Sequence, residues 1–118
     1  MKKKNKNSCI IVGEHKCKKI GSDLFYNLDT CLAIIIRDAL LEFADHEAKA
    51  SCPGHYTIDE EGKEIPMKKA CKKWQKDIRD VAELFDGYII NGFRGGYDEI
   101  LSQKMFEALA EIFPALWI

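Results

Sequence analysis

Residues 25–43, FYNLDTCLAIIIRDALLEF, constrain the fold more than any other part of the sequence. Apolar residues recur there every three or four positions, which predicts a helix from Asp29, as its N-cap, to about Glu47. Its wide apolar face comprises Leu28, Leu32, Ile35, Ile36, Ala39, Leu40 and Phe43. Ile34 and Leu41 lie on the opposite side. A helix that is apolar on two sides must bury both, against other helices of the chain or against a second subunit.

Two more helices follow from the same spacing. The second has Pro66 at its first position and runs to about Ile90, and the third runs from about Asp98 to Phe113. The inward face of the second comprises Met67, Cys71, Trp74, Ile78, Val81, Ala82, Phe85, Tyr88 and Ile89. The inward face of the third comprises Leu101, Met105, Ala108, Leu109 and Ile112. Residues 51–66 contain two turn signals and are predicted to form a loop.

The two ends of the chain differ in character. Residues 1–8 form a basic tail with too few apolar residues to fold, and Cys9–Val12 is β-prone. We interpret the latter as one short strand or an extended arm, with no second strand to pair with inside the chain. Residues 116–118 are apolar and are expected to pack on the core or on a neighbour. The prediction is therefore a mainly α, three-helix bundle-like single domain over residues 9–118 that forms a homo-oligomer.

Composition excludes several classes of protein. The 18 basic and 19 acidic residues nearly cancel, which argues against binding nucleic acid through a positive field over the whole domain. Five cysteines are an odd number, which favours reduced thiols in a cytosol over a disulfide framework. The first apolar run is too short for a signal peptide, and no run approaches the roughly 20 apolar residues that span a bilayer. We therefore expect a soluble cytoplasmic protein that does not bind a membrane.

The segment from Tyr26 to Phe43 resembles a pattern in small, uncharacterised proteins of tailed phages and prophages. The matching residues are Tyr26, Asn27, Leu28, Asp29, Leu32, Ala33, Ile36, Leu40 and Phe43, followed by Pro53, Gly54, Trp74, Ile78 and Phe85. The resemblance covers residues 23–90, but Tyr26 replaces the usual Trp, and Arg37-Asp38 replaces a more neutral stretch. It implies no activity. It implies an accessory protein in the cytoplasm of a bacterial host, of a kind often directed against host defences.

Two metal sites are conceivable from residue spacing. His15 and Cys17, with Cys52 and His55, supply nitrogen and sulfur ligands of the kind that structural zinc uses. Surface histidines and partly buried thiols explain the same residues, and we favour that interpretation. A magnesium site could use Glu42 and Asp45 with Asp77, Asp80 and Glu83, as in all-α nucleotide pyrophosphohydrolases. That spacing is loose, and we favour solvated charge as the interpretation of these carboxylates. Asp38, Glu42 and Asp45 form an acidic strip between the two apolar faces of the first helix.

A third possibility is an anion site centred on Arg94. This arginine stands between glycines, beside Phe93 and Tyr97, just before the third helix. Glycines expose backbone N–H groups, a helix N-terminus favours negative charge, and arginine forms paired hydrogen bonds with phosphate. A plain turn with a surface arginine is the simpler interpretation. The candidate ligand-binding residues are Arg94, Phe93, Tyr97, Asn91, Arg37 and Tyr56.

The sequence carries no coherent catalytic set and implies no cofactor. The leading prediction is a non-enzymatic, homo-oligomeric protein that binds and sequesters a small anionic, nucleotide-derived immune signal of the host. The alternatives are a protein–protein interaction module acting through the apolar tail or the lysine-rich face of the second helix, and a magnesium-dependent nucleotide hydrolase.

Replacing Arg94 by alanine distinguishes the first two functions. Arg94→Ala is expected to abolish the thermal stabilisation of the protein by nucleotides, because the arginine would supply the principal phosphate contact. Melts against mono-, cyclic and oligomeric nucleotides measure this. If the shift survives in the variant, the anion site lies elsewhere; binding of a protein partner should not change.

Overall fold

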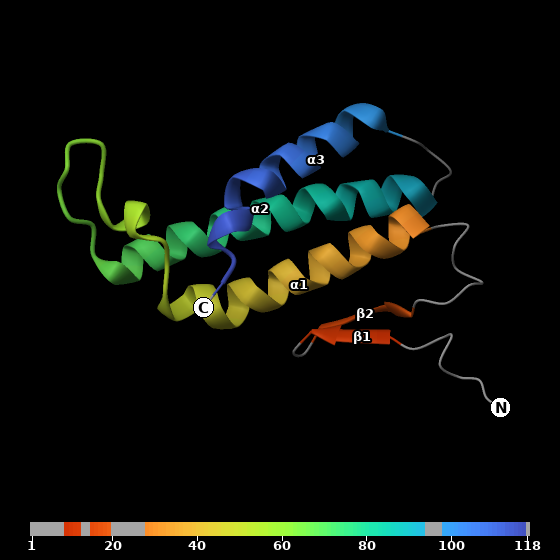
Figure 1. The fold of residues 1–118 in the computed structure, drawn as a ribbon, viewed down its shortest axis with the longest axis horizontal. Helices are drawn as coiled ribbons and strands as arrows, with labels where there is room; N and C mark the ends of the chain where they lie inside the picture. Colours follow the sequence, from red (N-terminus) through yellow and green to blue (C-terminus); the bar gives the residue numbers. More distant parts are fainter. Residues whose placement is uncertain (1–8, 13–14, 20–27, 94–97, 118) are drawn as a thin grey trace.

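The computed structural model describes residues 9–12, 15–19, 28–93 and 98–117. This part of the chain contains three α-helices, α1 (Leu28–Ala50), α2 (Met67–Phe93) and α3 (Glu99–Ile112) (Figure 1). Two short 3-10 helices, η3 (Gly54–Thr57) and η4 (Phe113–Ala115), follow α1 and α3. The predicted mainly α fold with three packed helices is thus confirmed.

Aspartates act differently at the starts of two helices. Asp98 caps α3, because its Oδ1 accepts a hydrogen bond from the backbone N–H of Leu101 at 2.9 Å. The predicted cap of α1 is wrong: the helix already includes Leu28, so Asp29 lies in its first turn. The Asp29 carboxylate instead accepts a hydrogen bond from the Tyr88 hydroxyl at 2.5 Å. It therefore ties the start of α1 to the last turns of α2.

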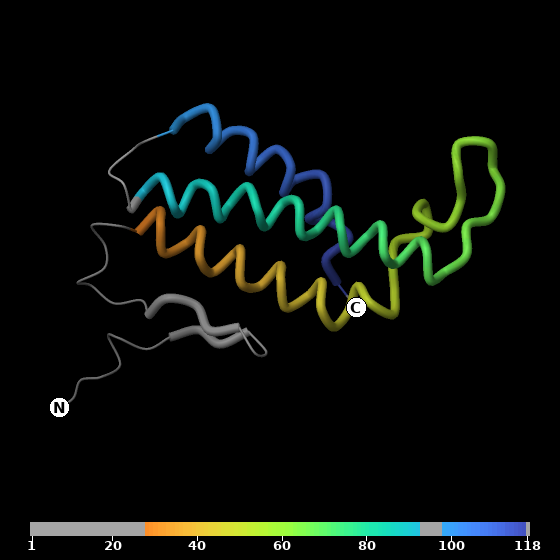
Figure 2. Tube along the Cα trace, turned by 180° about the vertical axis from the view of Figure 1, so that it is seen from behind, coloured from red at the N-terminus to blue at the C-terminus, as the bar shows by residue number. Residues whose placement is uncertain are grey.

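The three helices form an open layer with α2 in the middle. α1 and α3 lie on either side of α2 and barely contact each other, as Figures 1 and 2 show from opposite directions. A closed bundle would bring α1 and α3 together as well. Here the side of the layer between them stays open.

The core lies on the face of α2 that the sequence predicts. Eight of its nine predicted inward residues are buried: Cys71, Trp74, Ile78, Val81, Ala82, Phe85, Tyr88 and Ile89. Met67, the ninth, is 55% exposed. On α3, Met105 and Ile112 are buried, and Leu101, Ala108 and Leu109 pack partly buried against them, as predicted.

α1 uses the opposite face from the one its composition suggests. The residues it buries are Thr30, Cys31, Ala33, Ile34, Asp38, Leu40, Ala44 and Ala48. Leu28 and Leu32, from the predicted wide face, remain 40% and 48% exposed. The small side chains on the buried face let α1 approach the large residues of α2 closely, so packing selects that face although it is less hydrophobic.

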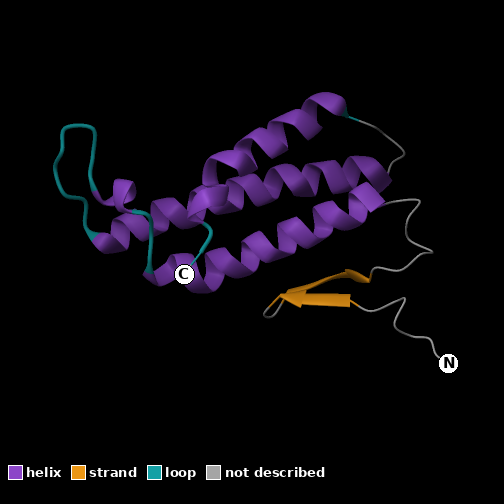
Figure 3. Ribbon diagram, viewed as in Figure 1, coloured by secondary structure: helices purple, strands orange, loops and turns teal. Residues whose placement is uncertain are grey.

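Two short strands lie beside α1 (Figure 3). β1 (Cys9–Val12) and β2 (His15–Lys19) pair antiparallel, with Val12 opposite His15. The expectation that the β-prone segment has no partner inside the chain is therefore wrong. The predicted basic tail, residues 1–8, lies outside the described residues. None of the described helices is long and apolar enough to cross a membrane.

Two glycines of α2 provide a matched test of the packing. A Cβ added to Gly87 would lie 3.7 Å from Leu101 Cδ2, an ordinary contact, whereas one added to Gly92 would lie only 3.1 Å from Thr30 Oγ1. Gly87→Ala is therefore expected to raise the free energy of unfolding by about 0.5–1 kcal/mol, the usual helix-interior gain. Gly92→Ala should raise the free energy of unfolding by less, because the added Cβ would crowd Thr30 of α1. Urea unfolding measures both, and equal gains would contradict the close approach.

Candidate functional site

An apolar groove runs along α1 on the open side of the helical layer. Its walls come from the exposed face of α1 and from the C-terminal part of the chain, and it encloses about 550 Å³. The lining residues are Ile35, Ile36, Ala39, Leu40, Glu42, Phe43, His46 and Glu47 from α1, with Leu109, Phe113 and Leu116 opposite. We refer to this surface as the α1–α3 groove.

The groove is apolar in its interior and acidic at its rim. Among the described residues that line it, the ionisable ones are Glu42, His46 and Glu47, and Glu42 Oε2 lies 3.0 Å from His46 Nε2. Phe113 forms part of the opposite wall and is 65% exposed. A surface of this kind suits an apolar ligand flanked by positive charge.

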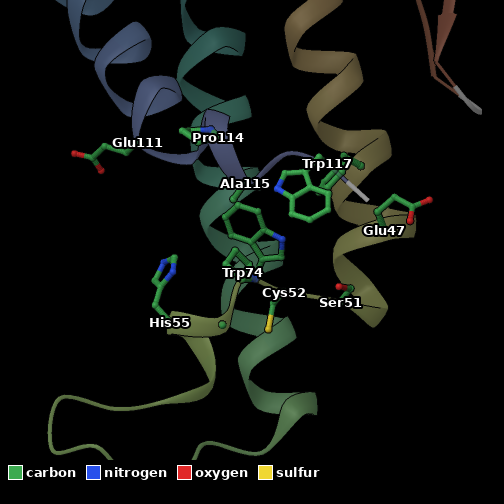
Figure 4. Close-up of a pocket in the computed structure, with 12 residues that line it drawn as sticks. Glu47, Ser51, Cys52, His55, Trp74, Glu111, Pro114, Ala115 and Trp117 are labelled. Carbon is green, nitrogen blue, oxygen red and sulfur yellow. The ribbon is translucent and has the colours of Figure 1, made fainter.

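A second cavity of about 540 Å³ adjoins the groove and shares Phe43 and Glu47 with it. Figure 4 shows Trp74 and Trp117 within it and Glu47 and Glu111 at its margins. Trp74 is buried, whereas Trp117 is 73% exposed. The carboxylates of Glu47 and Glu111 would repel an anionic ligand in this cavity.

Arg37, a predicted ligand residue, is engaged within the protein. Its Nη1 donates to Asp86 Oδ1 at 2.7 Å and its Nε to Asp38 Oδ1 at 3.0 Å. Burial lowers the pKa of the Arg37 guanidinium, but the hydrogen bonds to Asp86 and Asp38 outweigh it and raise the pKa above its ordinary value. Asp38 is only 5% exposed. Its burial next to Arg37 is possible because the two charges compensate.

Arg37 does line a cavity, of about 570 Å³, between α1 and α2. The other charged residues there are Asp38, Arg79, Glu83 and Asp86. Arg79 Nη2 also lies 2.8 Å from Asp45 Oδ1. Three carboxylates accompany two arginines in the lining. The cavity is therefore not an electrostatic trap for an anion.

Tyr56 lies far from Asn91, another predicted ligand residue. Its hydroxyl donates to Asp77 Oδ2 at 2.5 Å and its ring contacts Trp74, with centroids 5.2 Å apart. Burial, followed by the hydrogen bond to Asp77, raises the pKa of Tyr56 well above its usual range. Asp77 precedes Asn91 by fourteen residues of α2, which corresponds to about 21 Å along the helix axis. The structure therefore does not bring Tyr56 and Asn91 into one pocket.

The remaining predicted anion-site residues fall largely outside the description. Asn91 lies partly exposed in the last turn of α2. Arg94 and Tyr97 lie outside the described residues, and the side chain of Phe93 is not described either. The nucleotide-sized pocket around Arg94 therefore stays a prediction.

The predicted metal ligands are dispersed or paired. Asp77 accepts from Lys73 Nζ at 3.0 Å, Asp80 lies 2.8 Å from Lys76 Nζ, and Asp45 pairs with Arg79. Among the described residues, no three histidine, cysteine or acidic side chains converge as metal ligands would. The side chains of His15 and Cys17 belong to β2 and lie outside that description.

Sequence reasoning missed the groove, although its signal was present. The surplus apolar face of α1 and the apolar carboxy-terminal residues were expected to be covered by the core or a neighbour. In the structure the α1 face and Leu116 are partly buried against the core. Phe113 and Trp117 remain exposed beside them. Comparisons with protein-family models, with curated proteins and with solved structures found no match.

The ion-pair cluster of Arg37 provides a stability test. Arg37→Met leaves the buried Asp38 carboxylate without its cation and is expected to lower the free energy of unfolding by roughly 2–3 kcal/mol. The double variant Arg37→Met/Asp38→Leu should recover most of that loss, because an apolar pair replaces a buried charged one. Urea unfolding measures both. A single variant as stable as the parent would show that the cluster does not hold the two helices together.

Proposed function

We propose that the protein is a non-enzymatic interaction module that binds a basic amphipathic helix of a partner protein in the α1–α3 groove. The observation that carries this proposal is an apolar groove whose α1 wall is only partly buried by the rest of the chain. Ile35, Ile36 and Phe43 form one wall of the groove and Phe113 stands across from them. Soluble proteins rarely leave large apolar surfaces uncovered unless these bind something.

The dimensions of the groove suit a helix. Its α1 wall extends from Ile35 to Glu47, which corresponds to about 18 Å, or just over three helical turns. A helix bound in a groove anchors through side chains at positions i, i+3 or i+4, and i+7, which span about 11 Å. A partner helix bound between α1 and α3 would thus bridge the two helices, which barely contact each other.

The charge at the rim specifies the chemistry of the partner. Glu42 and Glu47 border the groove, and Glu111 borders the adjoining cavity. Lysines or arginines flanking the apolar stripe of a partner helix would complement these carboxylates. A second copy of this chain fits less well, because the apolar residues exposed on α3 are flanked by Glu107 and Glu111. Like charges would then face each other across the interface.

Sequestration of a nucleotide-derived anion is kept as the second candidate. The exposed lysines of α2, Lys68, Lys69 and Lys72 among them, could attract an anion to the protein at low salt. Its ligand contacts would come from Arg94 and Tyr97, as the Arg94→Ala melt tests. The hydrolase alternative has less support, because Asp45, Asp77 and Asp80 are paired with basic side chains.

A pair of designed helical peptides tests the groove. Both carry leucines at positions i, i+3, i+4 and i+7, and they differ only in having lysines or glutamates along the flanks. The lysine peptide is expected to bind at least about ten-fold more tightly, because the rim is acidic. Trp117, exposed beside the groove, should report binding by a blue shift of its emission, whereas the buried Trp74 should not respond.

Two exposed positions provide the matched variants. Phe113→Asp changes a groove residue that is 65% exposed, and Ile100→Asp changes a residue of α3 that is 69% exposed and does not line the groove. The first should weaken peptide binding at least about ten-fold and the second should not. Equal binding of the two peptides would contradict the proposal. So would a dimeric mass by light scattering that Phe113→Asp converts to a monomer, since the groove would then hold a second copy.

A further inference from the structure

We infer that Cys52, Met67 and Cys71 form a binding site for a soft monovalent metal ion, with Cu(I) as the expected class. Cys52 Sγ lies 3.8 Å from Met67 Sδ. The Cys71 thiol is a neighbour of Cys52 that contributes to raising the pKa of the Cys52 thiol. The three sulfur atoms therefore gather in one place, although only Cys52 was considered a ligand from the sequence.

The local fold explains why the sulfur atoms meet. Met67 and Cys71 are four residues apart at the start of α2 and share one face of the helix. α1 ends at Ala50, and the loop that follows places Cys52 over that face. The positions of the three sulfurs are thus set by two helix ends and a short connection.

The ligand set favours a soft ion over zinc. Thiolate and thioether sulfurs select Cu(I), whereas structural zinc takes four cysteine, histidine or carboxylate ligands. In Figure 4 the imidazole of His55, the nitrogen ligand that the sequence offered, extends away from the Cys52 sulfur. Among the described residues, no three histidine, cysteine or acidic groups converge. The proposed site is consistent with this, because it has two cysteines and its third ligand is the thioether of a methionine.

The spacing also suits direct coordination. Metal–sulfur bonds of about 2.3 Å place the sulfurs of a trigonal site about 4 Å apart. The observed separation of Cys52 and Met67 is 3.8 Å, so binding requires little rearrangement. Met67 is 55% exposed whereas Cys71 is 3% exposed. An ion can therefore enter from solvent on the side of Met67 and bind next to the buried Cys71.

The test is an anaerobic titration with Cu(I) in competition with a chromogenic Cu(I) chelator. The full chain carries Cys9→Ser and Cys17→Ser, so that thiols of the N-terminal segment do not contribute. One equivalent is expected to bind. Cys52→Ser and Cys71→Ser should abolish binding, and Met67→Leu, which keeps the size of an exposed side chain, should weaken it at least about ten-fold.

Cys31→Ala is the matched control, because Cys31 is a buried free thiol near the opposite end of α1. It should leave the affinity unchanged, and thermal melts confirm that each variant folds. Unaltered affinity in Met67→Leu would overturn the three-sulfur site. Equal losses in Cys31→Ala and Cys52→Ser, or binding of Zn²⁺ in preference to Cu(I), would also overturn the proposal.

Discussion

The close packing of α1 on α2 determines the rest of the structure. The α1 side of this interface contains Ala33, Ala44 and Ala48, all buried, whereas Ile78 and Phe85 are among the largest fully buried residues of α2. Small side chains on one helix allow the large side chains of the other to fill the space between them. Ile35, Ile36 and Phe43 of α1 consequently lie outside this interface and are only partly buried. The α1–α3 groove is thus a direct consequence of the interface that stabilises the protein.

A polar cluster lies within the same interface. Arg37 bridges Asp38 of its own helix and Asp86 of α2. Such a pair contributes little net stability compared with apolar residues, but it penalises any arrangement in which one charge is buried alone. We therefore expect it to fix the register of α1 against α2. The cluster also engages Arg37, which would otherwise be available to an external anion. This favours the apolar groove over an anion site at Arg37 as the binding surface.

Local patterns predicted the helices and the core face of α2, but they could not identify the contact face of α1. Spacing and capping are local properties, so the start of α3 at Asp98 and the burial of Trp74 followed from the sequence. The choice between two apolar faces depends on the shape of the partner helix, and the more hydrophobic face proved to be the outer one. The meeting of Cys52 with Met67 was equally inaccessible, because it depends on how a loop returns to α2.

The most direct test of the groove as a binding surface is a methyl NMR titration with the lysine-flanked peptide. Isoleucine δ-methyl groups report individual positions, and Ile35 and Ile36 line the groove whereas Ile58 and Ile100 are exposed elsewhere. The account predicts that the signals of Ile35 and Ile36 shift in proportion to bound peptide while those of Ile58 and Ile100 stay in place. Shifts confined to Ile58 or Ile100, or none at saturating peptide, would contradict it.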